Sequence, residues 1–227
     1  MLASCPARRR ARRGRAKAER AAGDGGLTTD RWLIGARRDA VVSVETEVKY
    51  RFGHPVEHDR LRAGLVELGA EARPIRHELN LRFDTSKGKL KRQGRVLRLR
   101  LVEGTATLTL KGPARRRGGL KTREEVELEV PDVDAGLAVL AGLGYLLVAA
   151  YAKRREPWWI DGVEVTLDTL EVGWFCELEG AAAAIAAVAS RLGLADREPE
   201  ERSYAELAGR RADPIDLGRL RDALAAS

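Results

Sequence analysis

The sequence has little cysteine, few aromatic residues and no long apolar run, and each shortage excludes a class of protein. Its two cysteines, Cys5 and Cys176, cannot form the disulfide framework of a small secreted domain. No stretch reaches the ~18 apolar residues of a membrane-spanning helix, and residues 1–26 lack the apolar segment of a secretory signal. We therefore expect a cytoplasmic protein with reduced thiols and no membrane partner.

The formal charge of +7 comes entirely from one end of the chain. Residues 1–40 hold 11 Lys and Arg against 4 Asp and Glu, and subtracting these from the totals of 41 and 34 leaves 30 of each sign. This arginine-rich stretch has few large apolar residues, which predicts a disordered tail. Three interpretations of the tail stay open. They are weak binding to RNA or anionic lipid, an organelle presequence, and an over-extended translation start. The neutral remainder gives no reason to expect any stronger nucleic-acid partner.

Charged and apolar residues alternate in several segments, as they do in a β-strand with one polar and one apolar face. The segment VETEVKYRF, residues 44–52, places Glu45, Glu47, Lys49 and Arg51 on one face. Similar patterns mark seven more candidate strands, at 77–85, 95–101, 106–112, 122–130, 151–159, 163–170 and 175–180. Turn signals separate the strands, and Asp161-Gly162 is typical of a two-residue hairpin.

Helices are predicted at about 54–69, 133–143 and 181–194, with stops at Gly69 and Gly144 and a further helix after Pro214. Their apolar faces, like those of the strands, must be buried. A two-layer α+β sandwich would leave the charged strand faces in solvent, whereas a closed barrel would turn them inward. Arg and Glu pairs at i, i+2 in at least four strands favour the barrel. We therefore predict an α+β fold, an eight-stranded antiparallel β-barrel with a charged interior and helices packed outside.

The predicted interior carries both signs of charge. Its basic members are Lys49, Arg98, Arg100, Lys111, Lys153 and Arg155, and its acidic members are Glu45, Glu47, Glu125, Glu127, Asp168, Glu177 and Glu179. A nucleic-acid groove would instead be basic and lined with stacking aromatics. Arginine forks match phosphate oxygens, but neighbouring carboxylates repel phosphate unless Mg²⁺ or Mn²⁺ lies between them. The mixture indicates a metal–polyphosphate site.

In order along the chain, these residues resemble the CYTH, or triphosphate-tunnel metalloenzyme, superfamily. Glu45-x-Glu47-x-Lys49 resembles its ExExK motif, NLRFDTSKGKLKRQGRVLRLR its FDT and paired-arginine strands, and LTLKGP its lysine strand. KTREEVELEV, AKRRE, VEVTLDTLE and FCELE follow in order, and ERSYAEL resembles the C-terminal RSYxxL of the class IV adenylate cyclase branch. The expected organisation is a basic tail (1–40), a CYTH triphosphate-tunnel domain (41–211) and a C-terminal helical extension (212–227).

The resemblance implies a tunnel that holds a nucleoside or inorganic triphosphate and a divalent metal, Mg²⁺ or Mn²⁺. Glu45 and Glu47 would hold metal, with Glu177, Glu179 and Asp168 on the other side. The six basic residues would grip the phosphates and act in catalysis, and Glu125 and Glu127 would line the substrate site. The stretch from Asp168 to Glu177 is one residue shorter than the family's D-x-x-x-G-x-G-x-F-x-E and lacks its first glycine. Because a shift of one residue exchanges the faces of a strand, this puts the pairing of Asp168 with Glu177 in doubt.

The cyclase-branch motifs favour conversion of ATP to cyclic AMP and pyrophosphate. The same tunnel would also serve to hydrolyse inorganic or thiamine triphosphate. A polyphosphate- or nucleotide-binding module without turnover is a third hypothesis, and the oligomeric state, a homodimer included, is left open.

Residues outside these motifs carry simpler expectations. The Gly112–Gly119 loop is either a lid or a solvated hairpin. Cys176 is expected to be buried. Tyr204 either packs the C-terminal helix, which is favoured, or covers the end of the tunnel. Trp158 and Trp159 are expected to pack on the outer surface, with base stacking as the less favoured alternative. The three histidines are expected at the surface: His54, His58 and His77.

Overall fold

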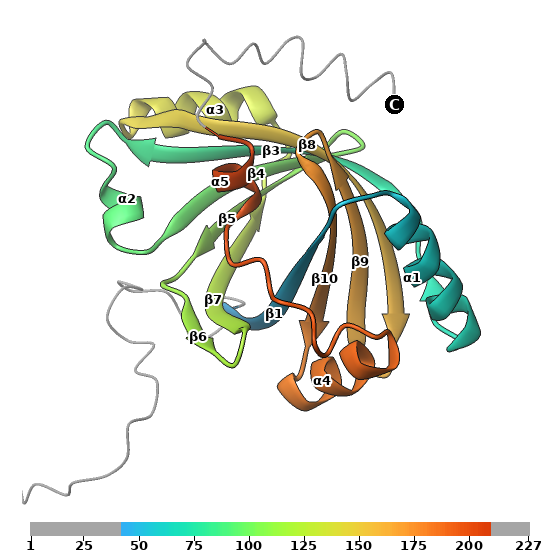
Figure 1. Cartoon of the computed structure of the whole chain (residues 1–227). Coiled ribbons are helices and arrows are strands. Elements are labelled where there is room, and N and C mark those ends of the chain that lie inside the picture. The colour runs from blue at the N-terminus through green and yellow to red at the C-terminus, as the bar shows by residue number, and fades with distance from the viewer. Residues whose placement is uncertain (1–41, 210–227) are drawn as a thin grey trace, which may run out of the picture. The chain divides into compact units, whose positions relative to one another are not determined.

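The structure, a computed structural model, describes residues 42–209. Eight antiparallel strands form a closed barrel in the order β1-β10-β9-β8-β3-β4-β5-β7, because β1 pairs with β10 on one edge and with β7 on the other (Figure 1). Closure leaves these strands without a free edge, and the predicted fold class is confirmed. The predicted tail (1–40) and C-terminal extension (212–227), with its helix after Pro214, lie outside the described residues.

The secondary structure follows the predicted segments closely. The barrel strands are β1 (Val42–Phe52), β3 (Arg76–Thr85), β4 (Val96–Val102), β5 (Thr105–Lys111), β7 (Leu120–Glu129), β8 (Tyr145–Ile160), β9 (Val163–Leu170) and β10 (Gly173–Gly180). Two short strands, β2 (Glu71–Ala72) and β6 (Arg115–Arg117), pair with β8 and β7. The helices are α1 (Val56–Glu67), α2 (Lys89–Arg92), α3 (Val133–Gly142), α4 (Ala182–Arg191) and α5 (Tyr204–Leu207).

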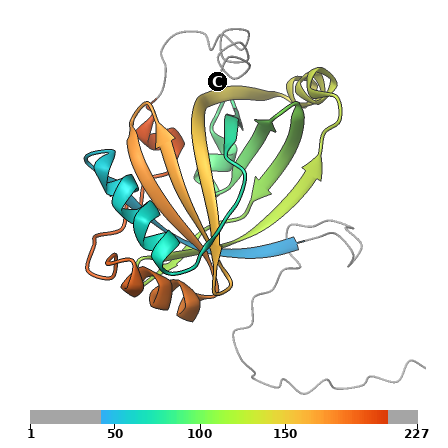
Figure 2. The same cartoon turned by 90° about the vertical axis from the view of Figure 1, so that its right-hand side faces the viewer.

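Strand β8 is longer than its alternating segment predicted, since it begins at Tyr145 rather than near residue 151. Its first half, YLLVAA, is a continuous apolar run that lacks the alternation of polar and apolar residues. The sequence therefore does not show which of its side chains face the barrel interior. Figure 2 shows β8 running along the barrel and bending over at one end.

Two tight hairpins set the register of neighbouring strands. Asp161 and Gly162 both have positive φ angles, 50° and 76°, so the predicted two-residue turn joins β8 to β9. Glu103 and Gly104, at 46° and 81°, join β4 to β5 in the same way. Each turn matches the right-handed twist of its strands and keeps the charged residues of both partners on one face.

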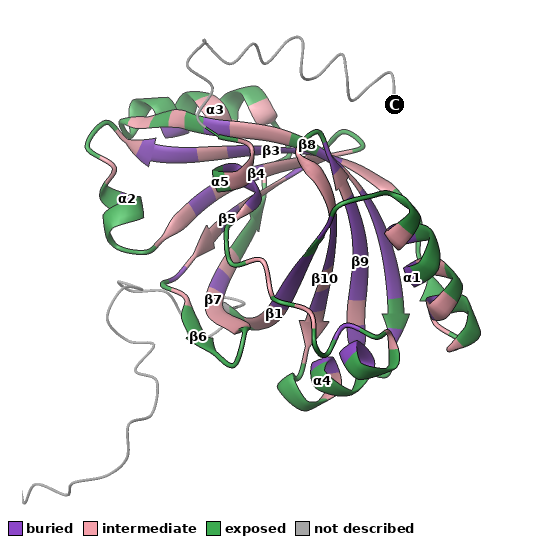
Figure 3. Cartoon of the chain, viewed as in Figure 1, coloured by how far each residue is buried: buried purple, intermediate pink, exposed green. Residues whose placement is uncertain are grey.

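The apolar core lies between the outer wall of the barrel and the helices. Leu65 of α1 and Val188 of α4, both fully buried, pack against the outer faces of β1, β8, β9 and β10 (Figure 2). Leu140 of α3 and Leu90 of α2 belong to a second cluster over β3, β4 and β5. Figure 3 shows exposed residues gathered on the helices and turns, with mostly buried and intermediate residues along the strands. The apolar strand faces therefore point outward.

Asp84, in the FDT stretch, has a structural role at the end of β3. Its side chain accepts hydrogen bonds from the backbone N–H groups of Thr85, Leu90 and Lys91 at 2.7–3.0 Å. These bonds satisfy donors at the start of α2 that lack a partner within the helix. The carboxylate thereby fixes the connection between β3 and α2.

His58 corrects the expectation that all three histidines are at the surface, because its side chain in α1 is only 5% exposed. Its Nε2–H donates to the carbonyl oxygen of Phe175 at 2.9 Å, and its ring packs edge-on against Phe52. Burial lowers the pKa of the imidazole. His54 is exposed, as expected, and His77 is half-buried. Across residues 42–209, no helix combines the length and apolar content needed to cross a membrane.

Replacing Leu65 with Ala should lower the free energy of unfolding by about 2–5 kcal/mol, because the change leaves a cavity between α1 and the barrel. Val66, the next residue, is 61% exposed and provides a matched control. Val66→Ala should change stability by less than about 0.5 kcal/mol in urea unfolding. Equal effects of the two changes would contradict the position of the core.

The buried His58 should make stability fall as the pH drops below the unfolded-state pKa of about 6.5. Below that pH the unfolded chain takes up a proton that the folded imidazole resists, so protonation favours unfolding. His58→Gln removes the titrating group, and its stability should fall less than that of the wild type between pH 7.5 and pH 5.0. Urea unfolding at both pH values measures the difference, and parallel losses would refute the assignment.

Candidate active site

A cavity of about 270 Å³ lies inside the barrel, and all eight barrel strands contribute to its wall. We call it the charged cavity. Ten cationic side chains and six carboxylates line it. The cationic residues are Lys49, Arg76, Arg82, Arg98, Arg100, Lys111, Lys121, Arg123, Lys153 and Arg155, and the acidic ones are Glu45, Glu47, Glu127, Glu164, Glu177 and Glu179. A wall of this kind suits a strongly anionic ligand.

Eleven of the thirteen site residues predicted from the sequence lie in this wall. The other two, Glu125 and Asp168, lie behind it with 1% and 0% exposure. Asp168 and Glu177 nonetheless both contact Arg155 from the inner face. The shorter β9–β10 connection has therefore not moved either residue to the outside.

One side of the charged cavity holds a row of carboxylates. Glu47, Glu179 and Glu164 are direct neighbours across β1, β10 and β9. Like charges directly opposite each other destabilise a sheet. Lys121 forms a close ion pair with Glu47, and Arg76 lies 3.4 Å from Glu164. No cation in the described part of the chain forms an ion pair with Glu179.

The environment of Glu179 favours a cation at this position. Burial, and then the charges of Glu45, Glu164 and Glu47, raise the pKa of Glu179 to about 7. A divalent cation beside these oxygens would remove the repulsion, so the residues present fit a hard metal ion such as Mg²⁺ or Mn²⁺. Within residues 42–209, no three carboxylate, His or Cys side chains form a complete metal cluster. Mg²⁺ at phosphate sites commonly has one or two carboxylate ligands and takes its other oxygens from water and phosphate.

Lys111 is held by two carboxyl groups whose pKa values are shifted in opposite directions. Its Nζ forms a close contact with Glu125 and lies 3.3 Å from Glu45. Burial raises the pKa of Glu125 to about 8, despite the neighbouring charge of Lys111. Burial would also raise the pKa of Glu45, but Lys111 outweighs it and the net shift is downward. Burial thus favours the protonated form of Glu125, which positions Lys111 from behind, while Lys111 favours the charged form of Glu45 in the wall.

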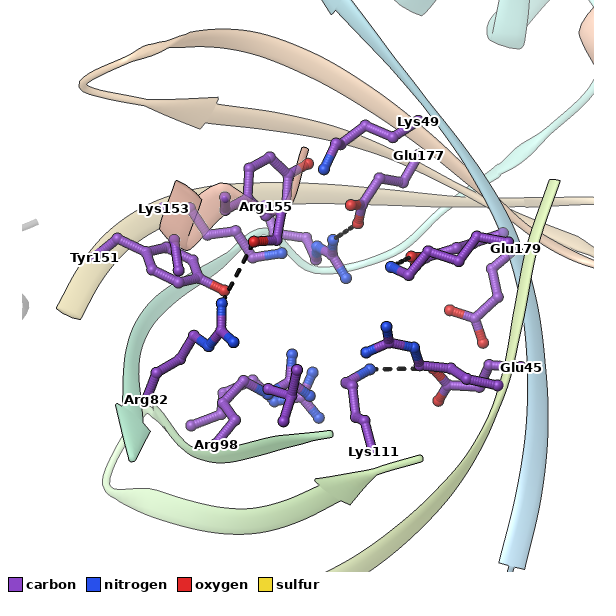
Figure 4. Close-up of a pocket in the computed structure, with 18 of the residues that line it drawn as sticks. Glu45, Lys49, Arg82, Arg98, Lys111, Tyr151, Lys153, Arg155, Glu177 and Glu179 are labelled. Atoms are coloured by element: carbon purple, nitrogen blue, oxygen red, sulfur yellow. Dashed lines mark hydrogen bonds and ion pairs between the residues drawn. The ribbon is translucent and has the colours of Figure 1, made fainter. Parts of the chain in front are cut away.

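The opposite side of the cavity is basic and only loosely neutralised. Figure 4 shows Arg82 and Arg98 across the cavity from Glu45 and Glu179. Arg98 and Arg100 each lie 3.8 Å from Glu127, at the limit of an ion pair. The Nε atom of Arg98 is buried without a hydrogen-bond partner in the structure. Because buried donors are normally satisfied, this side is built to receive oxygens from a ligand.

Asp168 organises the centre of the interior. Arg155 donates to both of its oxygens, at 2.8 and 2.6 Å, and Lys153 and the Tyr204 hydroxyl donate to Oδ2 at 3.1 and 2.8 Å. Burial would raise the pKa of this carboxyl, but Arg155 and Lys153 outweigh it and hold the pKa well below its usual range. With four donated hydrogen bonds and no exposed surface, Asp168 fixes the positions of the two cations.

Tyr204 reaches the site from the C-terminal segment. Its ring lines the charged cavity, with Lys49 Nζ 4.4 Å and Lys153 Nζ 5.1 Å from the ring centroid. Phe175 and Leu170 pack against it. Tyr204 therefore covers the two lysines beneath it, in line with the less favoured expectation, whereas the helix expected after Pro214 lies outside the described residues.

Reasoning from sequence missed several wall residues that the period of two could have identified. Lys121 and Arg123 precede Glu125 and Glu127 at steps of two on β7. Arg76 and Arg82 alternate with the outward residues of β3, and Glu164 shares a face with Asp168 on β9. All but Arg76 lie within the segments that resemble the family's motifs. The resemblance assigned none of the five a role in binding, so they were not among the candidates. The Gly112–Gly119 loop contains β6, and Arg115–Arg117 do not line the charged cavity.

Comparisons with known proteins agree with this geometry. A family model described as "CYTH domain" matches residues 43–203. The adenylate cyclase CyaB of Aeromonas hydrophila is 29% identical over 177 residues, which cover 72% of this chain and 87% of that protein.

Two solved structures are similar in fold. A putative adenylate cyclase of Vibrio parahaemolyticus has a TM-score of 0.62 and 24% identity, and the match covers 72% of this chain and 97% of that one. A putative adenylyl cyclase of Hippeastrum with a dominant triphosphatase activity has a TM-score of 0.60 and 20% identity, with 74% and 97% covered.

Replacing Asp168 with Asn should lower the free energy of unfolding by about 3–5 kcal/mol, because Arg155 and Lys153 would remain buried without their shared counter-ion. The loss should be the same in EDTA and in Mg²⁺, because pairing of Asp168 with Arg155 and Lys153 does not require a metal. Glu164→Gln, which breaks a long and partly exposed ion pair, should cost less than about 1 kcal/mol. A loss of stability by Asp168→Asn in Mg²⁺ alone would instead favour a metal ligand.

Proposed function

The chain belongs to the CYTH domain family, and from this premise we propose that it is a metal-dependent enzyme that converts ATP to cyclic AMP and pyrophosphate. The single observation that carries the proposal is the segregation of charge in the charged cavity. Four of the six wall carboxylates lie together on one side, where Lys111 and Lys121 pair with two of them, and the loosely neutralised Arg98 lies across the cavity. A triphosphate bound together with a divalent metal has a matching distribution of charge.

The basic residues would bind the phosphate chain. Arg98 and Arg100 have only long contacts with Glu127, and Arg98 also donates to the Thr109 hydroxyl at 3.3 Å. The unsatisfied Nε of Arg98 and the remaining donors of Arg100 would be available to phosphate oxygens. Lys111, Lys153 and Arg155 are held in place from behind and would be ready to bind without rearrangement. Together these charges would stabilise the negative charge that develops on departing pyrophosphate. The basic residues therefore carry both binding and catalysis in this proposal.

The carboxylate row would hold the metal. Glu45, Glu47 and Glu179 are the proposed ligands, supported by Glu177 near the centre. A bound Mg²⁺ or Mn²⁺ would supply Lewis-acid polarisation of a phosphoryl oxygen and neutralise part of the phosphate charge. Asp168 has a different role in the proposal, because its oxygens are already bonded to Arg155, Lys153 and Tyr204. It would act on the phosphates through those residues.

Hydrolysis of a triphosphate is the second candidate function. The dominant triphosphatase activity of the Hippeastrum protein favours it, since that protein shares the fold. The same charges would bind the substrate, and water would replace the ribose hydroxyl as the nucleophile. A nucleotide- or polyphosphate-binding module is the third candidate, and it would bind without turnover. The cytoplasmic location and the homodimer stay predictions.

Incubating the full chain with ATP, inorganic triphosphate or thiamine triphosphate, in Mg²⁺ or Mn²⁺, separates the three functions. We expect cyclic AMP and pyrophosphate from ATP, and no product in EDTA. Orthophosphate as the main product would replace the cyclase proposal with the triphosphatase. Tight binding without any product would leave the binding module. Chromatography of the nucleotide and phosphate products provides the measurement.

Arg98→Ala should lower kcat/KM by about 10²–10³-fold, because it removes a pre-positioned donor that faces the phosphates. Arg191→Ala is the matched control, since Arg191 pairs with Asp161 at the exposed β8–β9 turn and does not line the cavity. Its activity should equal that of the wild type. If both variants keep full activity, the charged cavity is not the active site.

A further inference from the structure

A second cavity of about 540 Å³ adjoins the charged cavity. We call it the Trp159 cavity. Arg76 and Glu164 line both cavities, so the two cavities share this part of their walls. It has an apolar part, formed by Pro74, Pro157 and Trp159 among others. Its volume lies within the range of small-molecule sites.

Trp159 is a large aromatic side chain without a partner. It is 46% exposed, and among the described residues neither a hydrogen bond nor a ring contact involves its indole. Trp158, in contrast, is buried and donates its indole N–H to Glu156. Outer-surface packing was expected for both tryptophans, and Trp158 alone follows it.

The position of Trp159 relates it to the proposed metal site. On the inner face it lies directly opposite Glu164, which is followed across the sheet by Glu179 and Glu47. The indole thus continues the carboxylate row by one strand. Its backbone is paired on both sides, with Glu71 of β2 and Glu164 of β9, so the ring stands on a fixed support.

Arg76 is the polar link between the two cavities. Its guanidinium has a 3.4 Å contact with Glu164, and its Nε is buried without a hydrogen-bond partner in the structure. A donor left unsatisfied between a charged and an aromatic cavity suits an oxygen or ring nitrogen of a ligand that occupies both.

We propose that the Trp159 cavity binds the flat aromatic base of a triphosphate ester, with the base stacked on Trp159 and the phosphates in the charged cavity. The inference rests on the proposed triphosphate site and deepens it, because it assigns the substrate to esters that carry a base rather than to inorganic triphosphate. Stacking on an exposed indole is available to every aromatic base. Adenosine and thiamine are two sources of such a base, and the test distinguishes them.

Calorimetric titration of the full chain in Mg²⁺ tests the proposal, with methylene-bridged analogues of ATP, thiamine triphosphate and inorganic triphosphate. Trp159→Ala should weaken binding of at least one base-bearing analogue by about ten- to a hundredfold and leave the inorganic analogue within about twofold. Trp159→Phe keeps a ring and should stay within a few-fold of the wild type. Leu143→Ala is the control, because Leu143 is 67% exposed and lines neither cavity.

The identity of the weakened analogue reports whether the base is adenine or thiamine. If the wild type binds all three analogues and Trp159→Ala changes none, or changes all equally, the base site is refuted while the triphosphate site stands. If the wild type binds none of them, the proposed function fails as well.

Indole fluorescence provides a second test that does not depend on the stability of Trp159→Ala. A base-bearing analogue should quench the wild-type emission and leave that of Trp159→Phe unchanged, whereas the inorganic analogue should quench neither. Equal quenching in both proteins would place the base elsewhere.

Discussion

A barrel with a charged interior is stable only if its buried charges are neutralised where they lie, and Asp168 meets this need at the centre. Removing a carboxylate from water is unfavourable unless donors replace its hydration. Arg155, Lys153 and Tyr204 supply these donors, and Glu177 and Glu78 pair with the same two cations. The hydrophobic contribution to stability is therefore displaced to the outside of the barrel, where the helices cover the apolar strand faces.

Away from this centre, the charges in the described part of the chain are not fully neutralised. One side of the charged cavity has a carboxylate without a paired cation, and the opposite side has an arginine with an unsatisfied donor. Among the described residues, no cation pairs with Glu179 on one side, and Arg98 has a buried, unsatisfied Nε atom on the other. Such groups reduce stability in the free protein. They are tolerated where a ligand satisfies them, and for this reason unsatisfied polar groups are informative about function.

Most of the fold could be predicted because one signal, the period of two, determines both the strands and their orientation. The alternation in β1, β4, β5 and β7 directs charge inward, and only a closed barrel buries all these faces together. The start of β8 escaped prediction because its run of apolar residues has no alternation. His58 was assigned to the surface because a single polar residue in an amphipathic helix gives no sign of the carbonyl that it will meet.

The sequence predicted which strand residues of the candidate site face the barrel interior. It did not predict their burial, which depends on tertiary contacts. Motif spacing put Glu45, Lys49 and Arg100 in the wall, but it did not separate residues that face the cavity from residues that support it. Asp168 and Glu125 share inner faces with wall residues, yet their neighbours enclose them completely. The alternation along β8 places Trp159 on the inner face of the barrel. The sequence alone does not show which of two adjacent tryptophans is buried and which is exposed.

The charged cavity draws on both ends of the described chain, from Glu45 in β1 to Tyr204 in α5. During synthesis on the ribosome, the first strand therefore emerges long before its partners in β10 and α5 exist. A nascent chain cannot assemble the wall of the charged cavity until nearly all of the barrel has left the exit tunnel. Contacts between residues so far apart in sequence also make closure a slow step of folding. The charged cavity therefore forms in one late event.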